Sequence, residues 1–197
     1  MPDGGQLAIH VHADPVVERQ AASIRVVPLD AGRLDEGGPP GTPRRVMLFA
    51  AIRALAGPRV WMHRGRSPEA CDWLGFVRAC AQVVADNCHD ADGPLADLGD
   101  YAPGWDDGPD PAAVGALFVA WGLTEKPFDE AMPGDVLVFA LPMAHAAVVT
   151  RRDAGRGLGV AHACWGRALA ETWVDGWWRE RAVAAYGWAE AGGHPSP

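Results

Sequence analysis

The sequence predicts an α+β domain in which helices come first and a sheet of short antiparallel strands follows. In the first half of the chain, apolar residues recur at the spacing of a helix face, as at Trp73, Phe76, Val77, Cys80 and Val84. After residues 133–134 (Pro-Gly), the pattern becomes that of short, closely connected strands. With 197 residues, 49% of them hydrophobic, the chain can bury a sizeable core.

The first 45 residues differ from the rest. Residues 7–11 and 23–27 are strand-like, and residues 35–41 have the Gly-Pro composition of a linker. This segment is too short to bury a core of its own. We therefore expect an N-terminal extension over residues 1–45, packed on the main domain or acting as a docking arm on a partner chain. The main domain is expected over residues 46–190, and a tail over 191–197.

Three helices are predicted. The first begins at Thr42-Pro43, with Val46, Phe49, Ile52 and Leu55 as its apolar stripe. The second has Asp72 as its N-cap, which places Trp73 in the first turn on the inward face. The third begins at Asp110-Pro111 and ends at Gly122. Its apolar residues are Val114, Leu117, Phe118 and Trp121.

The second half of the chain predicts strands at residues 135–139, 145–150, 159–165 and 183–188, with a turn over 153–157. A helical turn is expected near residues 172–181, on which Trp173 and Trp177 would share a face. Most of the nine tryptophans are expected in the core, and residues 178–181 (Trp-Arg-Glu-Arg) are the candidate protein-contact surface.

Composition excludes several classes of function. The net charge of −8 argues against nucleic acid as a main partner, because nucleic-acid binding favours a basic face. No apolar stretch reaches the roughly 18–20 residues that span a bilayer, so membrane insertion is not expected. Residues 1–12 lack the pattern of a secretory signal.

The cysteines predict neither a disulfide framework nor a metal centre. Cys71, Cys80, Cys88 and Cys164 show no CxxC spacing, so buried thiols in a reducing cytoplasm are favoured over pairing by accident of the fold. The Cys-His-Asp run at residues 88–90 belongs to no ligand quartet with zinc-like spacing. We expect no metal and no cofactor.

Two histidines carry the chemical interest. His145 opens one predicted strand and His162 lies inside the next, so in an antiparallel pair their side chains can meet. A histidine close to a helix N-terminus activates a thiol there, and a second polar residue then orients the first imidazole. By spacing alone, an ordinary pair of strand-end histidines with satisfied hydrogen bonds remains the alternative.

A family resemblance supports the chemical interpretation. The order of motifs resembles the NlpC-type cell-wall peptidases, which are papain-like cysteine peptidases, and most of all their branch found beside the tail-tip genes of phages and gene transfer agents. The similarity spans roughly residues 46–188, with motifs at 61–67, 72–77, 101–105, 133–139, 145–149, 161–163 and 177–179. It implies a papain-like fold, with helices packed on an antiparallel sheet.

The resemblance also assigns roles to residues. The nucleophilic cysteine of the family follows the Asp of an Asp-Cys-x-Gly motif, and that position is Trp73 here. The family's base corresponds to His145 and its orienting residue to His162, while a Tyr that often precedes the nucleophile has Trp61 as its nearest counterpart. Cys71 is a possible displaced nucleophile, although this branch often carries an extra cysteine there.

Two functions from different classes follow from the resemblance. In the first, the chain is a catalytically degenerate, structural component of a phage-like tail tip, made in the bacterial cytoplasm, assembled into a virion or gene-transfer-agent tail, and docked on hub or baseplate proteins. In the second, it is an active peptidoglycan endopeptidase that uses Cys71, His145 and His162 to cut the cell wall during DNA delivery. Capture of a stem peptide without cleavage is a third possibility.

Overall fold

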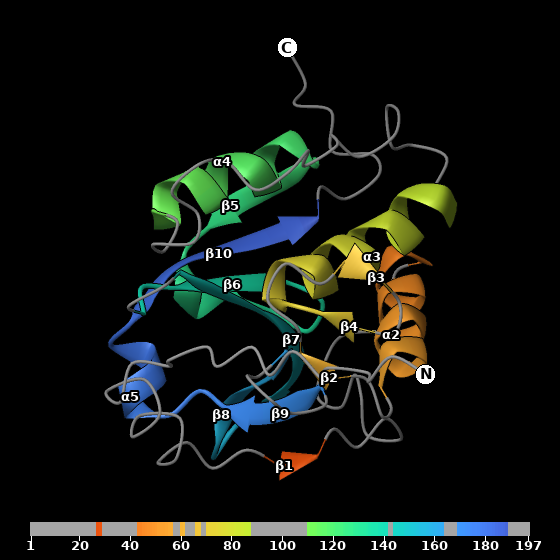
Figure 1. The fold of residues 1–197 in the computed structure, drawn as a ribbon. Coiled ribbons are helices and arrows are strands. Elements are labelled where there is room, and N and C mark those ends of the chain that lie inside the picture. The colour runs from red at the N-terminus through yellow and green to blue at the C-terminus, as the bar shows by residue number, and fades with distance from the viewer. Residues whose placement is uncertain are drawn as a thin grey trace, which may run out of the picture.

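The fold is described from a computed structural model over residues 27–28, 43–56, 60–61, 66–67, 70–87, 110–141, 144–163 and 169–188 (Figure 1). Within these residues, three long helices and a large antiparallel sheet form the body of the domain, and a small second sheet precedes the second of these helices. The predicted α+β class, with helices packed on a C-terminal antiparallel sheet, is confirmed.

The helices begin where their sequences supply caps. Helix α2 (Pro43–Leu55) begins at a proline, α3 (Trp73–Asn87) follows Asp72, and α4 (Pro111–Ala120) follows Asp110. Asp110 accepts a hydrogen bond from the Ala112 backbone N–H at 3.0 Å, as an N-cap does. Gly122, with φ of +84°, ends α4 in the left-handed conformation that glycine tolerates best.

The large sheet has the strand order β1-β9-β8-β7-β6-β10-β5, and all its pairs are antiparallel. Its strands are β1 (Val27–Pro28), β5 (Leu123–Lys126), β6 (Val136–Phe139), β7 (His145–Asp153), β8 (Gly157–His162), β9 (Ala170–Trp173) and β10 (Ala182–Trp188). Pairing of β1 with β9 joins part of the predicted extension to the sheet. The division of the chain at residue 45 stays a prediction, and α2 runs across it.

The small sheet consists of two-residue strands in the order β2-β4-β3. They are β2 (Val60–Trp61), β3 (Arg66–Ser67) and β4 (Ala70–Cys71). Strand β4 ends one residue before the N-cap of α3. The small sheet therefore leads the chain directly into the helix that carries Trp73.

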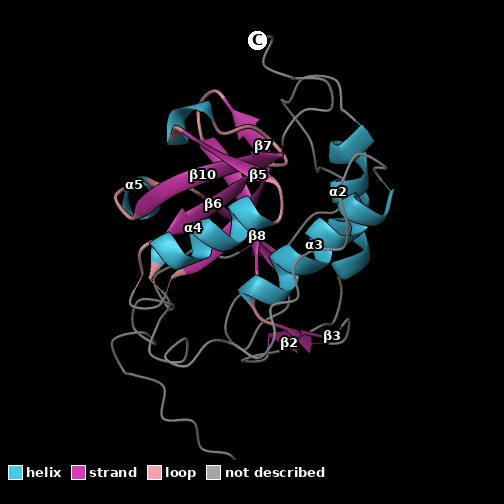
Figure 2. Cartoon of the chain, turned by 90° about the horizontal axis from the view of Figure 1, so that it is seen from above, coloured by secondary structure: helices cyan, strands magenta, loops and turns pink. Residues whose placement is uncertain are grey.

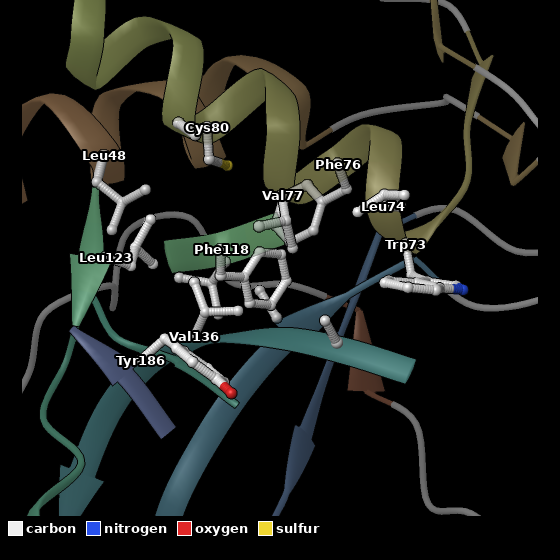
Figure 3. Packing of buried hydrophobic residues seen from close by; sticks show 14 of the residues in the cluster. Leu48, Trp73, Leu74, Phe76, Val77, Cys80, Phe118, Leu123, Val136 and Tyr186 are labelled. Atoms are coloured by element: carbon white, nitrogen blue, oxygen red, sulfur yellow. The ribbon is translucent and has the colours of Figure 1, made fainter. Parts of the chain in front are cut away.

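Helices α3 and α4 lie on one face of the large sheet, and α2 packs against α3, as the view from above in Figure 2 shows. The core cluster on this face is drawn in Figure 3 and includes Phe76, Val77, Phe118 and Val136. A second cluster lies on the opposite face, where the short helix α5 (Gly176–Arg179) packs through Trp178. Alternation along β7 explains the division, because Val148 belongs to the first cluster and Val149 to the second.

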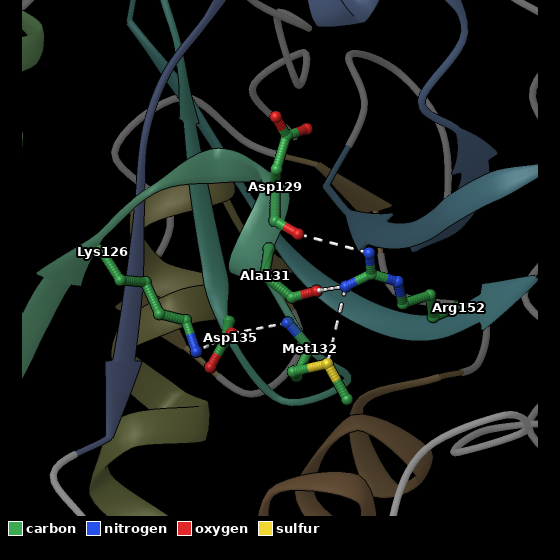
Figure 4. A network of polar contacts seen from close by, with 6 residues as sticks. All are labelled: Lys126, Asp129, Ala131, Met132, Asp135 and Arg152. Atoms are coloured by element: carbon green, nitrogen blue, oxygen red, sulfur yellow. Dashed lines mark hydrogen bonds and ion pairs between the residues drawn. The ribbon is translucent and has the colours of Figure 1, made fainter.

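A polar network fixes the segment between β5 and β6 (Figure 4). The Asp135 carboxylate accepts a hydrogen bond from the Met132 backbone N–H and pairs with Lys126 Nζ, each at 2.6 Å. Arg152 donates to the Ala131 carbonyl at 3.0 Å and to the Asp129 carbonyl at 3.2 Å. These bonds tie the 3₁₀ turn η3 (Phe128–Glu130) to the strands beside it.

Three details of the sequence interpretation are wrong. Val46 is 51% exposed, because α2 turns Leu48, Phe49 and Ile52 inward at a 3.6-residue period. Residues 172–173 belong to strand β9, so Trp173 and Trp177 share no helix face. Trp178, expected on a contact surface, is buried. Its backbone N–H is held by the Asp175 cap, and its ring packs on Phe139 at a centroid distance of 4.8 Å.

Several predictions fall outside the described residues. They include the strand at 7–11, the linker at 35–41, the Cys-His-Asp run at 88–90, residues 164–165 of the predicted strand, and the 191–197 tail. Among the helices described, none combines the length and the apolar character that crossing a bilayer requires.

Candidate active site

Trp73 is the first residue of α3 and is 8% exposed. The buried Asp72 caps the helix, since its Oδ1 accepts a hydrogen bond from the Gly75 backbone N–H at 2.6 Å. The rest of the predicted stripe, namely Phe76, Val77, Cys80 and Val84, is buried as well. The position predicted for a nucleophile therefore stands at a capped helix N-terminus, in the core, and holds an indole.

His145 and His162 approach each other across two neighbouring strands. His145 opens β7, opposite Phe139 of β6, and His162 ends β8, opposite Ala170 of β9. In the β7–β8 ladder Val148 pairs with Ala161. Continuing that register places His162 opposite residue 147. His145 lies two residues before 147 on β7, so it is a diagonal neighbour of His162. Diagonal neighbours on one face lie within reach of ring side chains.

The two imidazoles share a hydrogen bond. His145 Nε2 lies 2.8 Å from His162 Nδ1, and the ring centroids are 5.0 Å apart. His162 Nε2 in turn lies 2.9 Å from the Thr172 hydroxyl on β9. The three side chains form one line of hydrogen bonds that crosses β7, β8 and β9. The expected meeting of the two histidines is present, and Thr172 extends it.

Tryptophans pack on this line from both faces of the sheet. The Trp73 ring, which belongs to the first core cluster, lies 6.2 Å from the His145 ring between centroids. Trp178, from the second cluster, lies 5.9 Å from the His145 ring and 5.4 Å from the His162 ring. The histidine pair thus stands where the two clusters meet at the ends of β7 and β8.

Burial keeps both imidazoles neutral. It lowers the pKa of His145 well below the ordinary value of 6.5, and the neighbouring His162 lowers that pKa further. Burial also lowers the pKa of His162 to about 4. His162 is 1% exposed. At neutral pH each ring therefore has one N–H donor and one nitrogen lone pair.

The sequence identified both histidines and Trp73, and it missed two residues of the cluster. The sequence predicts Thr172 in a helical turn, and nothing local marks it as a partner of His162. The sequence predicts Trp178 on a contact surface, whereas Asp175 three residues earlier is the cap that turns it inward. Cys71 ends β4, two residues before Trp73, and its side chain lies outside the described residues. Cys80 is buried in the first cluster, as expected for a core thiol.

The arrangement has the parts of a base relay, and the residue at the start of α3 beside it is not a thiol. A neutral imidazole oriented by a second one can accept a proton from a thiol held at a helix N-terminus. An indole at that position offers no such proton. Within the described residues, no group of three or more His, Cys, Asp or Glu side chains is arranged to hold a metal ion.

Likeness to known proteins is found among solved structures. No protein-family model matches the chain, and no curated protein matches it. A solved structure from Staphylococcus aureus subsp. aureus Mu50, described as similar to lipoprotein of the NLP/P60 family, aligns with a TM-score of 0.47 and 14% identity. The alignment covers 80% of this chain and 45% of that one, so this chain spans less than half the length of that protein.

Proposed function

We propose that the chain is a cell-wall-peptidase-like domain that has lost hydrolysis and serves as a structural part of a phage-like tail tip. One observation carries the loss of hydrolysis: the buried Trp73 indole occupies the capped start of α3, 6.2 Å from the His145 ring between centroids. The first turn of a helix beside an imidazole is where a thiol would be activated. The indole has no nucleophilic atom to offer there.

The retained histidines support descent from a working site. His145 and His162 keep the hydrogen bond that a base and its orienting residue need, at 2.8 Å. A buried neutral imidazole such as that of His162 is costly to keep unless its hydrogen bonds are satisfied, and here both nitrogens of His162 have partners. With the nucleophile replaced, the cluster contributes packing and hydrogen bonds to the domain.

The tail-tip role is supported by the order of sequence motifs, which resembles the tail-associated branch of these peptidases. Its partners would be hub or baseplate proteins, contacted through residues 1–45 or through a face of the domain. The test is copurification: the chain should sediment with assembled tails when expressed together with tail genes of its source genome. A chain that stays in the soluble fraction while complete tails form would contradict the role.

The loss of hydrolysis is tested on purified peptidoglycan. Wild-type protein should release no new amino groups from the stem peptides above the level of a His145→Ala control. Hydrolysis by the wild type that disappears in the control would overturn the degenerate site. The loss of hydrolysis and the tail-tip role are independent, because a tail protein can be an active hydrolase and an inactive protein can remain outside the tail.

The intact histidine pair favours a second candidate, an active peptidoglycan endopeptidase with Cys71 as its nucleophile. Its backbone lies at the end of β4, so its α-carbon is at most about 7 Å from that of Trp73. A Cys71→Ala variant, with Cys80→Ala as the matched control, separates the candidates. The endopeptidase requires activity in the wild type and the control and none in Cys71→Ala.

A further inference from the structure

Thr172 closes the line of hydrogen bonds that begins at His145. Its hydroxyl lies 2.9 Å from His162 Nε2, and the opposite nitrogen of the same ring lies 2.8 Å from His145 Nε2. Thr172 is 3% exposed and is held on β9 opposite Val160 of β8. Its hydroxyl therefore faces the ring from a fixed position in the sheet.

A line of two neutral imidazoles and one hydroxyl has two consistent directions. In the first, His145 Nε2–H donates to His162 Nδ1, and His162 Nε2–H donates to Thr172. In the second, Thr172 donates to His162 Nε2, and His162 Nδ1–H donates to His145 Nε2. Each neutral ring carries one N–H, so a mixed arrangement places two hydrogens or two lone pairs against each other.

The two directions differ at the remaining nitrogen of His145. The first leaves Nδ1 of His145 with a lone pair, and the second leaves it with a hydrogen. The first direction also puts both rings in the Nε2–H form, which is the favoured neutral form of free histidine, whereas the second puts both in the other form. The intrinsic tautomer preference of each of the two rings therefore favours the first direction.

We infer that Thr172 is a positioning residue whose hydroxyl accepts the His162 Nε2–H and so fixes His145 as a base at Nδ1. A threonine hydroxyl can accept while its own hydrogen turns elsewhere, which a valine of the same shape cannot do. The role of this base rests on the proposed function, because a lone pair at Nδ1 is what a thiol at position 73 would have needed. The tautomers themselves do not depend on it.

Nitrogen-15 NMR of the imidazoles tests the inference, since protonated and unprotonated ring nitrogens resonate far apart. Histidine-labelled full-length protein is measured at neutral pH, with His145→Gln and His162→Gln used for assignment. Wild type should show Nε2 protonated and Nδ1 unprotonated in both rings. Protonated Nδ1 in either ring of the wild type would overturn the inference, whatever the variants do.

Three variants separate positioning from folding. Thr172→Val removes the acceptor and leaves the buried His162 Nε2–H without a partner. This cost outweighs the intrinsic tautomer preference, so both rings should change to the Nδ1–H form. Thr172→Ser restores the hydroxyl and should restore the wild-type pattern. Thr150→Val is the matched control, because it removes a buried strand hydroxyl that bonds to Gly159 and Glu171 instead, and it should leave both tautomers unchanged.

Unchanged tautomers in Thr172→Val, or a failure of serine to restore them, would contradict the positioning role. These results are distinguishable from failure of the proposed function. Hydrolysis by the wild-type protein would overturn the degenerate site and leave the tautomer pattern standing. A reversed pattern would overturn the role of Thr172 and leave the replacement of the nucleophile by Trp73 standing.

Discussion

The indole of Trp73 lies beside the imidazole of His145, with ring centroids 6.2 Å apart and planes tilted by 55°. One ring comes from the first turn of α3 and the other from the first residue of β7. A helix start, which favours an anion, thus faces a base that burial keeps neutral. A cysteine in place of the indole would meet both conditions for forming a thiolate.

Replacing Trp73 with cysteine should therefore create hydrolysis. We expect Trp73→Cys to cleave peptidoglycan stem peptides at a low rate that the wild type lacks, since attack geometry in a site not held by its own substrate contacts is imperfect. The measurement is release of amino groups from purified peptidoglycan, followed by mass spectrometry of the products.

The control for this gain is the double variant Trp73→Cys/His145→Ala, which keeps the thiol and removes the base. It should lose at least about 100-fold of the acquired rate, the range typical of general-base catalysis. Equal rates in the two variants would show that the thiol acts without His145. The histidine pair would then not be the retained base of a former catalytic site.

Trp73 should also contribute strongly to stability. Trp73→Ala removes a large buried ring from the first core cluster and should lower the free energy of unfolding by about 3–5 kcal/mol. Trp73→Phe should cost less, because an aromatic ring remains in the space. Urea unfolding at neutral pH measures both, with the exposed Val119→Ala as the control, which should change the free energy by under about 0.5 kcal/mol. An alanine variant as stable as the wild type would mean that the indole fills no needed space.

Much of the fold is predictable from local patterns. The starts of α2 and α4 follow from proline positions and the Asp110 cap, and the strands after residue 135 follow from apolar runs between turns. The meeting of His145 with His162 also follows, because adjacent strands of a hairpin share a ladder. These features depend on residues close together in the chain.

The remainder depends on contacts that no local pattern encodes. The sequence predicts a helical turn that begins near residue 172, because Thr172 and Trp173 precede a true helical turn, and only pairing with β8 makes these two residues part of a strand. The sequence predicts Trp178 on a contact surface, because its burial depends on the distant sheet face presented by Phe139 and His162. Thr172 joins the histidine line for the same reason, through its place in the sheet.

Acid should begin to destabilise the domain at pH values higher than those at which most carboxylates titrate. His162 has a pKa of about 4 in the folded protein and about 6.5 when unfolded, so the unfolded chain binds more protons between these values. Its contribution to stability is complete above pH 6.5 and is lost as the pH falls toward 4. One pKa unit corresponds to about 1.4 kcal/mol, so the loss from His162 is about 3 kcal/mol. His145, whose pKa is lowered too, acts in the same direction.

The measurement is urea unfolding at several pH values between 4 and 7, for the wild type and for His162→Gln. Glutamine keeps a polar side chain and does not titrate, so the slope of stability against pH should be shallower in the variant, even if its stability at pH 7 is lower. Parallel curves for the two proteins would show that His162 is not the buried neutral group described above.

The two aspartate caps should differ in their contribution to stability. Asp72 is 4% exposed and bonds the Gly75 N–H at 2.6 Å, whereas Asp110 is exposed and bonds the Ala112 N–H at 3.0 Å. Replacing a cap residue with alanine costs about 0.5–2 kcal/mol. Asp72→Ala should lie at the upper end of this range, because water cannot replace the lost bond to a buried N–H, and Asp110→Ala at the lower end.

Asparagine variants separate the cap from the charge. Asp72→Asn keeps an oxygen that accepts the Gly75 N–H and should retain most of the stability in urea unfolding, while Asp72→Ala loses it. If Asp72→Asn and Asp72→Ala lower the free energy of unfolding by the same amount, the charge of Asp72 at the start of α3, and not its hydrogen bond, fixes the helix end. In that case the orientation of Trp73 toward His145 would depend on the helix dipole more than on the cap.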